Sequence, residues 1–387
     1  MAMALVSGAL ANKHQNGGAA WTRLSWVLGL KKLGFQVYFV EQIDRAHCVG
    51  ASGAVVSFAD SMNLAYFQEV TGQFGLADSA ALIYEQGEAL FGPPWTELIE
   101  FAEAADLLIN ITGHLTVLPL KNRPRHKVYV DLDPGFTQFW HASGNSGPRL
   151  AGHDYYFTVG ENIGTPGCSI PVGDIRWRAI RQPVVLGDWP VSEAGHQDRF
   201  TTVASWRGPY GRVEQSGAVF GLKAHEFRKF IELPKRVKQE VEIALDIQPG
   251  DSKDLDQLRH HGWRVVDPKQ VVPDPLGFRR YIQTSGAEFS VAQGIYVETQ
   301  SGWFSDRTVR YLASGKPVLI QDTGFSHNYP VGEGLLAFRT LDEAVKGAEC
   351  IAQNYESHCR AARALAEAYF DSNKVLGRLL EEIGVAP

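Results

Sequence analysis

The stretch that decides the fold is residues 297–320, with the sequence VETQSGWFSDRTVRYLASGKPVLI. It begins as an irregular loop rich in Gly and Ser. Ser305 suits the N-cap of a helix, Asp306 suits its positive end, and Gly315 suits its C-terminal exit. The apolar run 318–320 is of the kind that a parallel sheet buries on both faces. The stretch therefore predicts a loop, a helix and a buried strand, as in an α/β protein.

The start of this predicted helix is also a candidate anion site. A loop that ends at a helix N-terminus leaves backbone N–H groups free, and these suit a phosphate. The candidate cradle is the backbone of Ser301, Gly302 and Ser305 with the side chain of Arg307. Asp306 either accepts a hydrogen bond from a ribose or sugar hydroxyl or only caps the helix. The alternative is an ordinary loop, helix and strand without a ligand.

Composition and length indicate a two-domain globular protein. The chain has 387 residues, of which 44% are hydrophobic and 21% charged. The formal net charge of −6 argues against non-specific nucleic-acid binding. The four cysteines form no Cys-x-x-Cys pair, so neither a zinc ribbon nor a disulfide framework is expected. No signal peptide or transmembrane segment is recognisable, so we expect a cytoplasmic protein with reduced thiols.

Strands and helices alternate along residues 1–180, the pattern of a doubly wound, mostly parallel sheet. Residues 161–197 are rich in Gly and Pro and are expected to hold the domain boundary. A second alternating series follows, with a basic helix expected around 222–239. Two such series imply an α/β protein with two Rossmann-like domains facing a cleft, walled by the C-terminal edges of their strands.

Two segments together resemble the GT-B glycosyltransferases. In the first, a turn of Asn16, Gly17 and Gly18 follows the first strand and leads into a helix that ends at Gly34. In the second, residues 307–319, RTVRYLASGKPVL, are similar to the family's helix–Ala-x-Gly-x-Pro-Val signature in the donor domain.

The resemblance implies the GT-B architecture, in which a nucleotide sugar sits mainly on the C-terminal of two Rossmann-like domains. It implies an acceptor-binding domain at residues 1–180 and a nucleotide-sugar donor domain at 181–370. The terminal helix, 371–387, is expected to cross back and pack on the N-terminal domain.

One departure from the family concerns an acidic pair. Retaining members often carry a Glu-x7-Glu pattern that ends five residues before the signature glycine. Gly302 and Arg310 stand at the matching positions, so neither carboxylate is present. The departure leaves the stereochemistry of transfer open and keeps a degenerate, non-catalytic site among the alternatives.

Transfer from a nucleotide sugar needs positive charge at the departing diphosphate and often a base at the acceptor hydroxyl. Arg207, after a predicted strand, and Lys223, opening a predicted helix, are the candidate diphosphate ligands. His14 and His114 are the candidate catalytic bases, because each follows a predicted strand and the histidine pKa lies near neutrality. Each of the four is otherwise an ordinary solvated side chain. The Asn16-Gly17-Gly18 turn is expected to form the acceptor-side loop.

Asp131 and Asp133 are a separate candidate, because period-two alternation places both carboxylates on one face of a strand, as a metal-ligand pair requires. However, Pro134 and Gly135 form a turn signal directly afterwards, and metal-dependent glycosyltransferases with Asp-x-Asp have a different fold. We therefore expect no metal and no cofactor, with the nucleotide sugar as the donor substrate.

The sequence thus predicts a metal-independent glycosyltransferase that moves a hexosyl or related sugar from a nucleotide-diphosphate sugar. The alternatives are a nucleotide-sugar epimerase of the same architecture and a non-catalytic nucleotide-sugar-binding protein. The acceptor is a small molecule, a lipid or a saccharide, and no nucleic acid is expected as a partner. Aromatic residues in the first half hint at an apolar or planar acceptor, although most are expected in the core.

Overall fold

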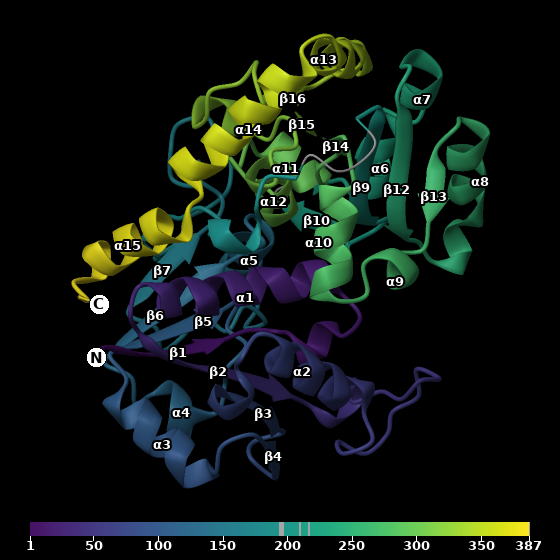
Figure 1. Cartoon of the computed structure of the whole chain (residues 1–387). Helices are drawn as coiled ribbons and strands as arrows, with labels where there is room; N and C mark the ends of the chain where they lie inside the picture. Colours follow the sequence, from purple (N-terminus) through teal and green to yellow (C-terminus); the bar gives the residue numbers. More distant parts are fainter. Residues whose placement is uncertain (193–196, 209, 216, 387) are drawn as a thin grey trace.

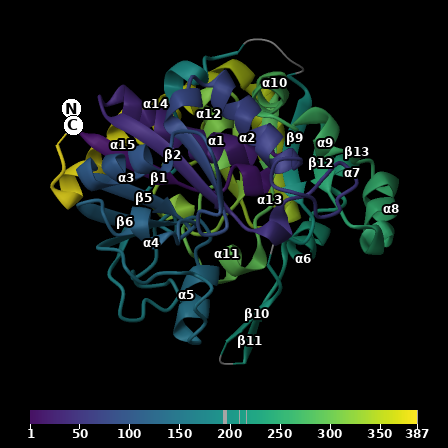
Figure 2. The same ribbon diagram turned by 90° about the horizontal axis from the view of Figure 1, so that it is seen from below.

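The structure is a computed structural model that describes residues 1–192, 197–208, 210–215 and 217–386. It consists of two Rossmann-like domains, one on the eight-stranded sheet of β1 to β8 and one on a six-stranded sheet of β9 and β12 to β16 (Figure 1). The predicted fold class is confirmed. Both chain ends lie at the N-terminal domain, close to each other in both views (Figures 1 and 2).

The N-terminal sheet has the strand order β4-β3-β2-β1-β5-β6-β7-β8, and all its pairings are parallel except that of β3 with β4. Its central strands are buried along their length, as expected for apolar runs in a parallel sheet. The last strand lies in the Pro/Gly-rich segment 161–197, where no strand was predicted. The strands are β1 (Met3–Ser7), β2 (Gln36–Ile43), β3 (Ala80–Tyr84), β4 (Ala89–Phe91), β5 (Leu107–Ile111), β6 (His126–Asp131), β7 (Tyr155–Thr158) and β8 (Trp177–Ala179).

Helices and short 3-10 turns connect these strands. Those that concern the site are η1 (Ala11–Lys13), α1 (Gly17–Lys32), η2 (Arg45–His47) and α5 (Phe136–Ala142). The others named in Figure 1 are α2 (Met62–Gln73), α3 (Trp95–Ala104) and α4 (Leu118–Lys121). Among the described helices, none combines the length and the apolarity needed to cross a membrane.

The C-terminal sheet is parallel, with the order β13-β12-β9-β14-β15-β16. A separate hairpin, β10 (Val213–Gln215) with β11 (Ala218–Phe220), extends from it. The sheet strands are β9 (Arg199–Ser205), β12 (Glu240–Asp246), β13 (Arg264–Val266), β14 (Ala287–Ser290), β15 (Val318–Gln321) and β16 (Leu335–Phe338). Its helices are α6 (Lys223–Arg228), α7 (Leu233–Arg236), α8 (Ser252–His260), α9 (Pro268–Val271), α10 (Pro275–Gln283), α11 (Gly294–Glu298), α12 (Asp306–Ala313), α13 (Leu341–Gln353) and α14 (Tyr355–Tyr369).

The prediction of one basic helix around 222–239 was wrong. Two short helices, α6 and α7, occupy this segment, and the chain turns between them. Pro234 stands in the first turn of α7, where a missing N–H is tolerated, but it could not have continued a helix from α6.

The stretch 297–320 forms the predicted helix and strand. Ser305 is the N-cap of α12 and accepts a hydrogen bond from the Arg307 N–H at 3.3 Å. Gly315 has φ of +70°, the left-handed conformation that suits the exit of a helix. The strand that follows, β15, is buried on both faces. The short helix α11 before the loop was not predicted.

Helix α1 joins the two domains (Figure 1). Its N-terminus packs on α10, where Trp21 Nε1 donates a hydrogen bond to the Pro275 carbonyl at 2.7 Å. Its far end packs on the terminal helix α15 (Ser372–Ile383), which crosses back to the N-terminal domain as predicted. The packing is close at Gly29, where an added Cβ would lie 2.6 Å from Leu376 Cδ1 and 3.0 Å from Ser372 Cβ.

We expect Gly29→Leu to lower the free energy of unfolding by about 1–3 kcal/mol, because the larger side chain must push α15 away from α1. The matched control is Gly72→Leu, since an added Cβ at Gly72 of α2 meets nothing within 4 Å. The control should not destabilise the protein, because Leu is the better helix former. Urea unfolding measures both changes. An equal decrease in the free energy of unfolding in the two variants would contradict the close packing of α1 on α15.

Candidate active site

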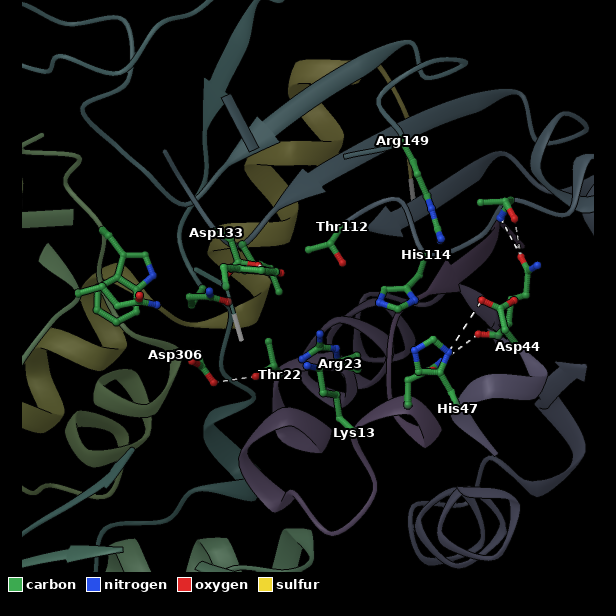
Figure 3. A pocket seen from close by; sticks show the side chains of 18 of the residues that line it. Lys13, Thr22, Arg23, Asp44, His47, Thr112, His114, Asp133, Arg149 and Asp306 are labelled. Carbon is green, nitrogen blue, oxygen red and sulfur yellow. Dashed lines mark hydrogen bonds and ion pairs between the residues drawn. The ribbon is translucent and has the colours of Figure 1, made fainter. Parts of the chain in front are cut away.

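A cavity of about 590 Å³ lies between the two domains. The loops after β1, β2, β5 and β6 line it on one side, and residues near the starts of α6, α11 and α12 line it on the other. The C-terminal edges of both sheets therefore face this cavity, as the sequence predicted for a cleft. Its acidic, basic and histidine side chains, shown in part in Figure 3, are Lys13, Arg23, Asp44, His47, His114, Asp133, Arg149, Lys223 and Asp306.

One buried carboxylate holds the loop after β1. Glu41, on β2, accepts hydrogen bonds from the backbone N–H groups of Leu10, Ala11 and Asn12 at 2.6–2.8 Å and from Asn12 Nδ2 at 3.0 Å. Burial raises the pKa of Glu41, and the donated hydrogen bonds oppose that rise. This arrangement shapes η1 and sets Lys13 at the edge of the cavity (Figure 3).

Arg23 reaches the middle of the cavity from α1 (Figure 3). Its Nη1 donates to the Ala19 carbonyl at 3.2 Å, whereas its buried Nε has no partner among the described residues. Burial lowers the pKa of Arg23, and the carboxylates of Asp306, Glu41 and Asp133 oppose this. Because a guanidinium keeps its proton in proteins, Arg23 is a fixed positive charge with an unused donor. It is suited to an anionic ligand.

His114 follows β5 in a loop with unusual backbone geometry. Thr112 has φ of 55° and Gly113 has φ of 67°, so two consecutive residues adopt the left-handed conformation. Burial, reinforced by Arg23 and Arg149, lowers the pKa of His114 to about 3. The imidazole is therefore neutral at physiological pH, and the field around it is strongly positive.

Asp131 and Asp133, at the end of β6, have different roles. Asp131 accepts hydrogen bonds from Thr137, Gln138 and Thr158 and from the Asp133 N–H, at 2.6–3.0 Å, so both its oxygens are fully used. Asp133 instead lines the cavity and accepts from Tyr210 Oη at 3.2 Å. The two carboxylates do not form the metal-ligand pair that simple alternation suggested.

Asp133 has the ionisation behaviour of a proton acceptor. Burial, with the nearby charge of Asp131, raises the pKa of Asp133 to about 6, although the Tyr210 hydrogen bond, Lys13 and Arg23 oppose the shift. A carboxylate with this pKa is mostly ionised at neutral pH and is a stronger base than an ordinary aspartate.

Lys223 opens α6 and reaches the cavity from the C-terminal domain. Its side chain is buried, and within the described residues it makes no hydrogen bond or ion pair. Burial, reinforced by Arg307, lowers the pKa of Lys223 to about 7, while Glu288 and Asp306 oppose the shift. An anion in the cavity would favour the protonated form of this lysine.

Asp306 lines the cavity and also joins the domains. Its Oδ2 accepts a hydrogen bond from Thr22 Oγ1 of α1 at 2.6 Å (Figure 3). The same oxygen accepts from Arg310 Nη1 at 3.3 Å. Arg310 in turn donates to Ser25 Oγ at 3.2 Å. The arginine that replaces a family carboxylate thus lies in the interface between α12 and α1.

The other predicted donor-side residues lie away from the cavity. Arg207 makes a two-bond pair with Asp251, Nε to Oδ2 at 2.7 Å and Nη2 to Oδ1 at 2.5 Å, near the surface. Arg307 is buried and donates to Glu288, Ser290 and the Val203 carbonyl at 2.5–2.6 Å.

Ser301, Gly302 and Ser305 also have partners within the protein. The Gly302 N–H donates to the Thr323 carbonyl at 2.8 Å, and an added Cβ there would meet Asn162 at 2.7 Å. Ser301 is buried, with its hydroxyl 3.2 Å from the Trp303 N–H.

On the acceptor side, His14 hydrogen-bonds with Asn63 at 3.2 Å and does not line the cavity. Asn16 caps α1, accepting from the Ala19 N–H at 2.9 Å. Gly17 and Gly18 pack on α10, and a Cβ at Gly17 would lie 2.0 Å from the Asp274 carbonyl oxygen. The turn is therefore part of the domain interface.

The sequence analysis missed three cavity cations, Lys13, Arg23 and Arg149. Arg23 has a local signal, because it interrupts an otherwise apolar helix face that holds Ala20 and Trp26. Lys13 directly precedes His14, which the sequence analysis considered as a catalytic base. Arg149 has no local signal, since it lies in a loop between α5 and β7, far in sequence from the other cavity residues.

Comparison with known proteins gives matches only at the level of structure. No protein-family model matches the chain, and no curated protein matches its sequence. HepE from Anabaena, solved with UDP and glucose, aligns over 99% of this chain and 100% of its own, at 11% identity and TM-score 0.57. An α-glucosyltransferase, solved with UDP and a 13-mer DNA containing an HMU base, aligns over 99% of both chains, at 9% identity and TM-score 0.60.

The chain has the GT-B fold. A third GT-B neighbour is a putative UDP-N-acetylglucosamine 2-epimerase from Listeria monocytogenes, over 98% of this chain and 95% of its own, at 12% identity and TM-score 0.51. The structures similar to this chain thus include an α-glucosyltransferase and a protein described as a putative epimerase. Within the described residues, no group of three or more His, Cys, Asp and Glu side chains could hold a metal ion.

We expect Asp131→Ala to lower the free energy of unfolding by about 2–4 kcal/mol, because it leaves buried donors of Thr137, Gln138 and Thr158 without an acceptor. Asp133→Ala, two residues further, should leave stability at pH 7.5 unchanged or slightly higher, since it removes a carboxylate whose pKa is raised by burial. Urea unfolding compares the two variants. An equal decrease in the free energy of unfolding in both variants would contradict the separate roles of Asp131 and Asp133.

Proposed function

We propose that the protein transfers a glycosyl group from a nucleotide-diphosphate sugar to an acceptor hydroxyl, without a metal or another cofactor. The observation that carries the proposal is the cavity between two Rossmann-like domains, lined by cations from both. GT-B neighbours solved with UDP support the choice of donor class. A diphosphate leaving group departs with negative charge, and fixed cations stabilise it without reorganisation.

Lys223 and Arg23 are the proposed diphosphate ligands. Lys223 is buried in the wall formed by the C-terminal domain, and Arg23 keeps a buried Nε without a partner in the described part of the chain. Each has donor capacity that the protein itself leaves unused, unlike Arg207 and Arg307. Asp306, also in the cavity wall, is proposed to accept from a donor hydroxyl, because Thr22 and Arg310 occupy only one of its oxygens.

Asp133 is the proposed general base. The acceptor oxygen attacks the anomeric carbon, the bond from that carbon to the diphosphate oxygen breaks, and the acceptor proton passes to the Asp133 carboxylate. With its pKa near 6, Asp133 is a better proton acceptor at neutral pH than His114, whose pKa is near 3. His114 remains a neutral hydrogen-bonding partner for the acceptor.

A panel of nucleotide sugars tests the proposal. We expect at least one to raise the melting temperature and to bind in calorimetry, and its nucleoside diphosphate to be released when an acceptor is supplied. Exchange of solvent deuterium into the sugar without an acceptor would instead indicate the epimerase. Binding without either reaction would indicate a non-catalytic protein, and no binding at all would contradict the proposed donor.

Binding of that nucleotide sugar should weaken as the pH rises through about 7. Lys223 is protonated below its pKa of about 7 and neutral above it, so its attraction for the diphosphate is lost on the alkaline side. If only the protonated form binds, the dissociation constant rises about tenfold between pH 6 and pH 8. A nucleotide sugar, rather than a free nucleotide, is used because its diphosphate does not titrate in this range.

Two variants provide the controls for this pH profile. Lys223→Arg keeps its charge at all these pH values, so its dissociation constant should vary less between pH 6 and pH 8. Lys223→Met should bind roughly 10- to 100-fold more weakly at pH 6, because it loses a charge-assisted hydrogen bond. A tenfold pH effect that persists in both variants would assign the titration to another group, such as Asp133.

A further inference from the structure

One end of the cavity is built only by the N-terminal domain. This distal end consists of Lys13, His47, His114 and Arg149, together with Asp44. Figure 3 shows Arg149 and His47 approaching His114 from opposite sides. These side chains come from separate loops after β1, β2 and β5 and before β7, so the fold brings together a cluster that no local sequence contains.

The distal end has more positive charge than the protein neutralises. The side chains of Arg149 and Lys13 make no hydrogen bond or ion pair within the described residues. The carboxylate of Asp44 already lies 3.9 Å from His47. Arg149 and Lys13 thus face the cavity without an ion pair in the described part of the chain. Burial lowers the pKa of Lys13, and the cavity carboxylate of Asp133 opposes this shift. The excess of positive charge is unfavourable unless a ligand brings negative charge.

The distal cations and Lys223 have different charged neighbours, and Arg23 lies between these two ends of the cavity (Figure 3). The charged groups that act most strongly on His114 are Arg23, Arg149, Lys13 and His47, and each lowers its pKa. Those acting on Lys223 are Arg307, Glu288 and Asp306, all in the C-terminal domain. A diphosphate bound by Lys223 and Arg23 would offset the charge of Arg23. However, Arg149, Lys13 and His47 also act on His114 and are not among the proposed diphosphate ligands.

The backbone that presents Arg149 is itself unusual. Arg149 has φ of 55°, a left-handed conformation that is strained for a non-glycine residue. Its loop packs on the loop after β5, where a Cβ on Gly113 would lie 2.9 Å from the Pro148 carbonyl oxygen and 3.0 Å from Arg149 Cβ. Such strain persists at functional sites because the surrounding structure imposes it.

We propose that the acceptor carries an anionic group, a phosphate or a carboxylate, which Arg149 binds at the distal end together with Lys13 and His47. This inference rests on the proposed glycosyl transfer. The guanidinium of Arg149 offers a planar pair of donors that matches either anion, and Lys13 adds a second positive charge. The acceptor is then a hydrophilic anionic molecule rather than an apolar or planar one.

The test is calorimetric titration of the full-length protein saturated with UDP, so that the donor end is occupied. The probes are glucose 6-phosphate, glucuronate and inorganic phosphate, with glucose as the uncharged counterpart. We expect one or more of the anions to bind at least tenfold more tightly than glucose. The phosphate and carboxylate probes separate the two anion classes.

The variants assign this binding to Arg149. Arg149→Ala should weaken the anion roughly 10- to 100-fold and leave the UDP affinity within about twofold, whereas Arg149→Lys should restore part of the loss. The control is Arg125→Ala, which removes an equal charge from an exposed arginine paired with Asp106 at 3.5 Å, outside the cavity. It should change neither affinity.

The outcomes separate the inference from the proposed function. A protein that binds UDP but prefers none of the anions to glucose, or whose anion affinity is the same in Arg149→Ala, contradicts the anionic acceptor. A protein that binds the anions through Arg149 but binds no nucleotide or nucleotide sugar contradicts the proposed glycosyl transfer. Circular dichroism confirms that each variant is folded.

Discussion

The buried guanidinium of Arg310 ties the two domains together, and the geometry of the cavity depends on that tie. Arg310 lies on α12 and donates to Ser25 of α1 and to Asp306, which also accepts from Thr22 of α1. Burial lowers the pKa of Arg310 to about 10, so it stays charged at neutral pH and needs the neighbouring carboxylate. Because α1 and α12 both supply residues to the cavity wall, this contact bears on how the two sheet edges face each other.

Within that frame, buried carboxylates hold the loops and leave the cations free for a ligand. Glu41 uses both oxygens on the backbone and side chain of the loop after β1, and Asp131 uses both on groups after β6 and at the end of β7. Neither forms an ion pair with Lys13 or Arg23 within the described residues, although the charge of Glu41 acts on Arg23. Glu41 and Asp131 therefore pre-organise the loops of the site without taking part in ligand binding. The cations of the cavity keep their positive charge for a ligand.

Local signals predicted most of the fold and part of the site. The roles of Ser305, Asp306 and Gly315 at the ends of α12 depend on neighbours within a few residues. They could therefore be inferred from the amino-acid sequence around them. Lys223 and His114 were found because residues after strands or at helix starts face the cleft of a doubly wound sheet. Local order could not reveal Arg149, which approaches His114 only after the chain has folded.

The sequence by itself determined the two α/β series, the helix–Gly–Pro–strand unit and the terminal helix, whose crossing back was implied only by the resemblance to the GT-B family. Period and capping act over a few residues, so they are visible in a linear chain. Only the tertiary structure decided which cations are unpaired. Arg207 finds Asp251 and Arg307 finds Glu288, while Lys223 and Arg149 find no carboxylate partner among the described residues. Charge pairing depends on distance in space, and a sequence does not state which distant residues meet.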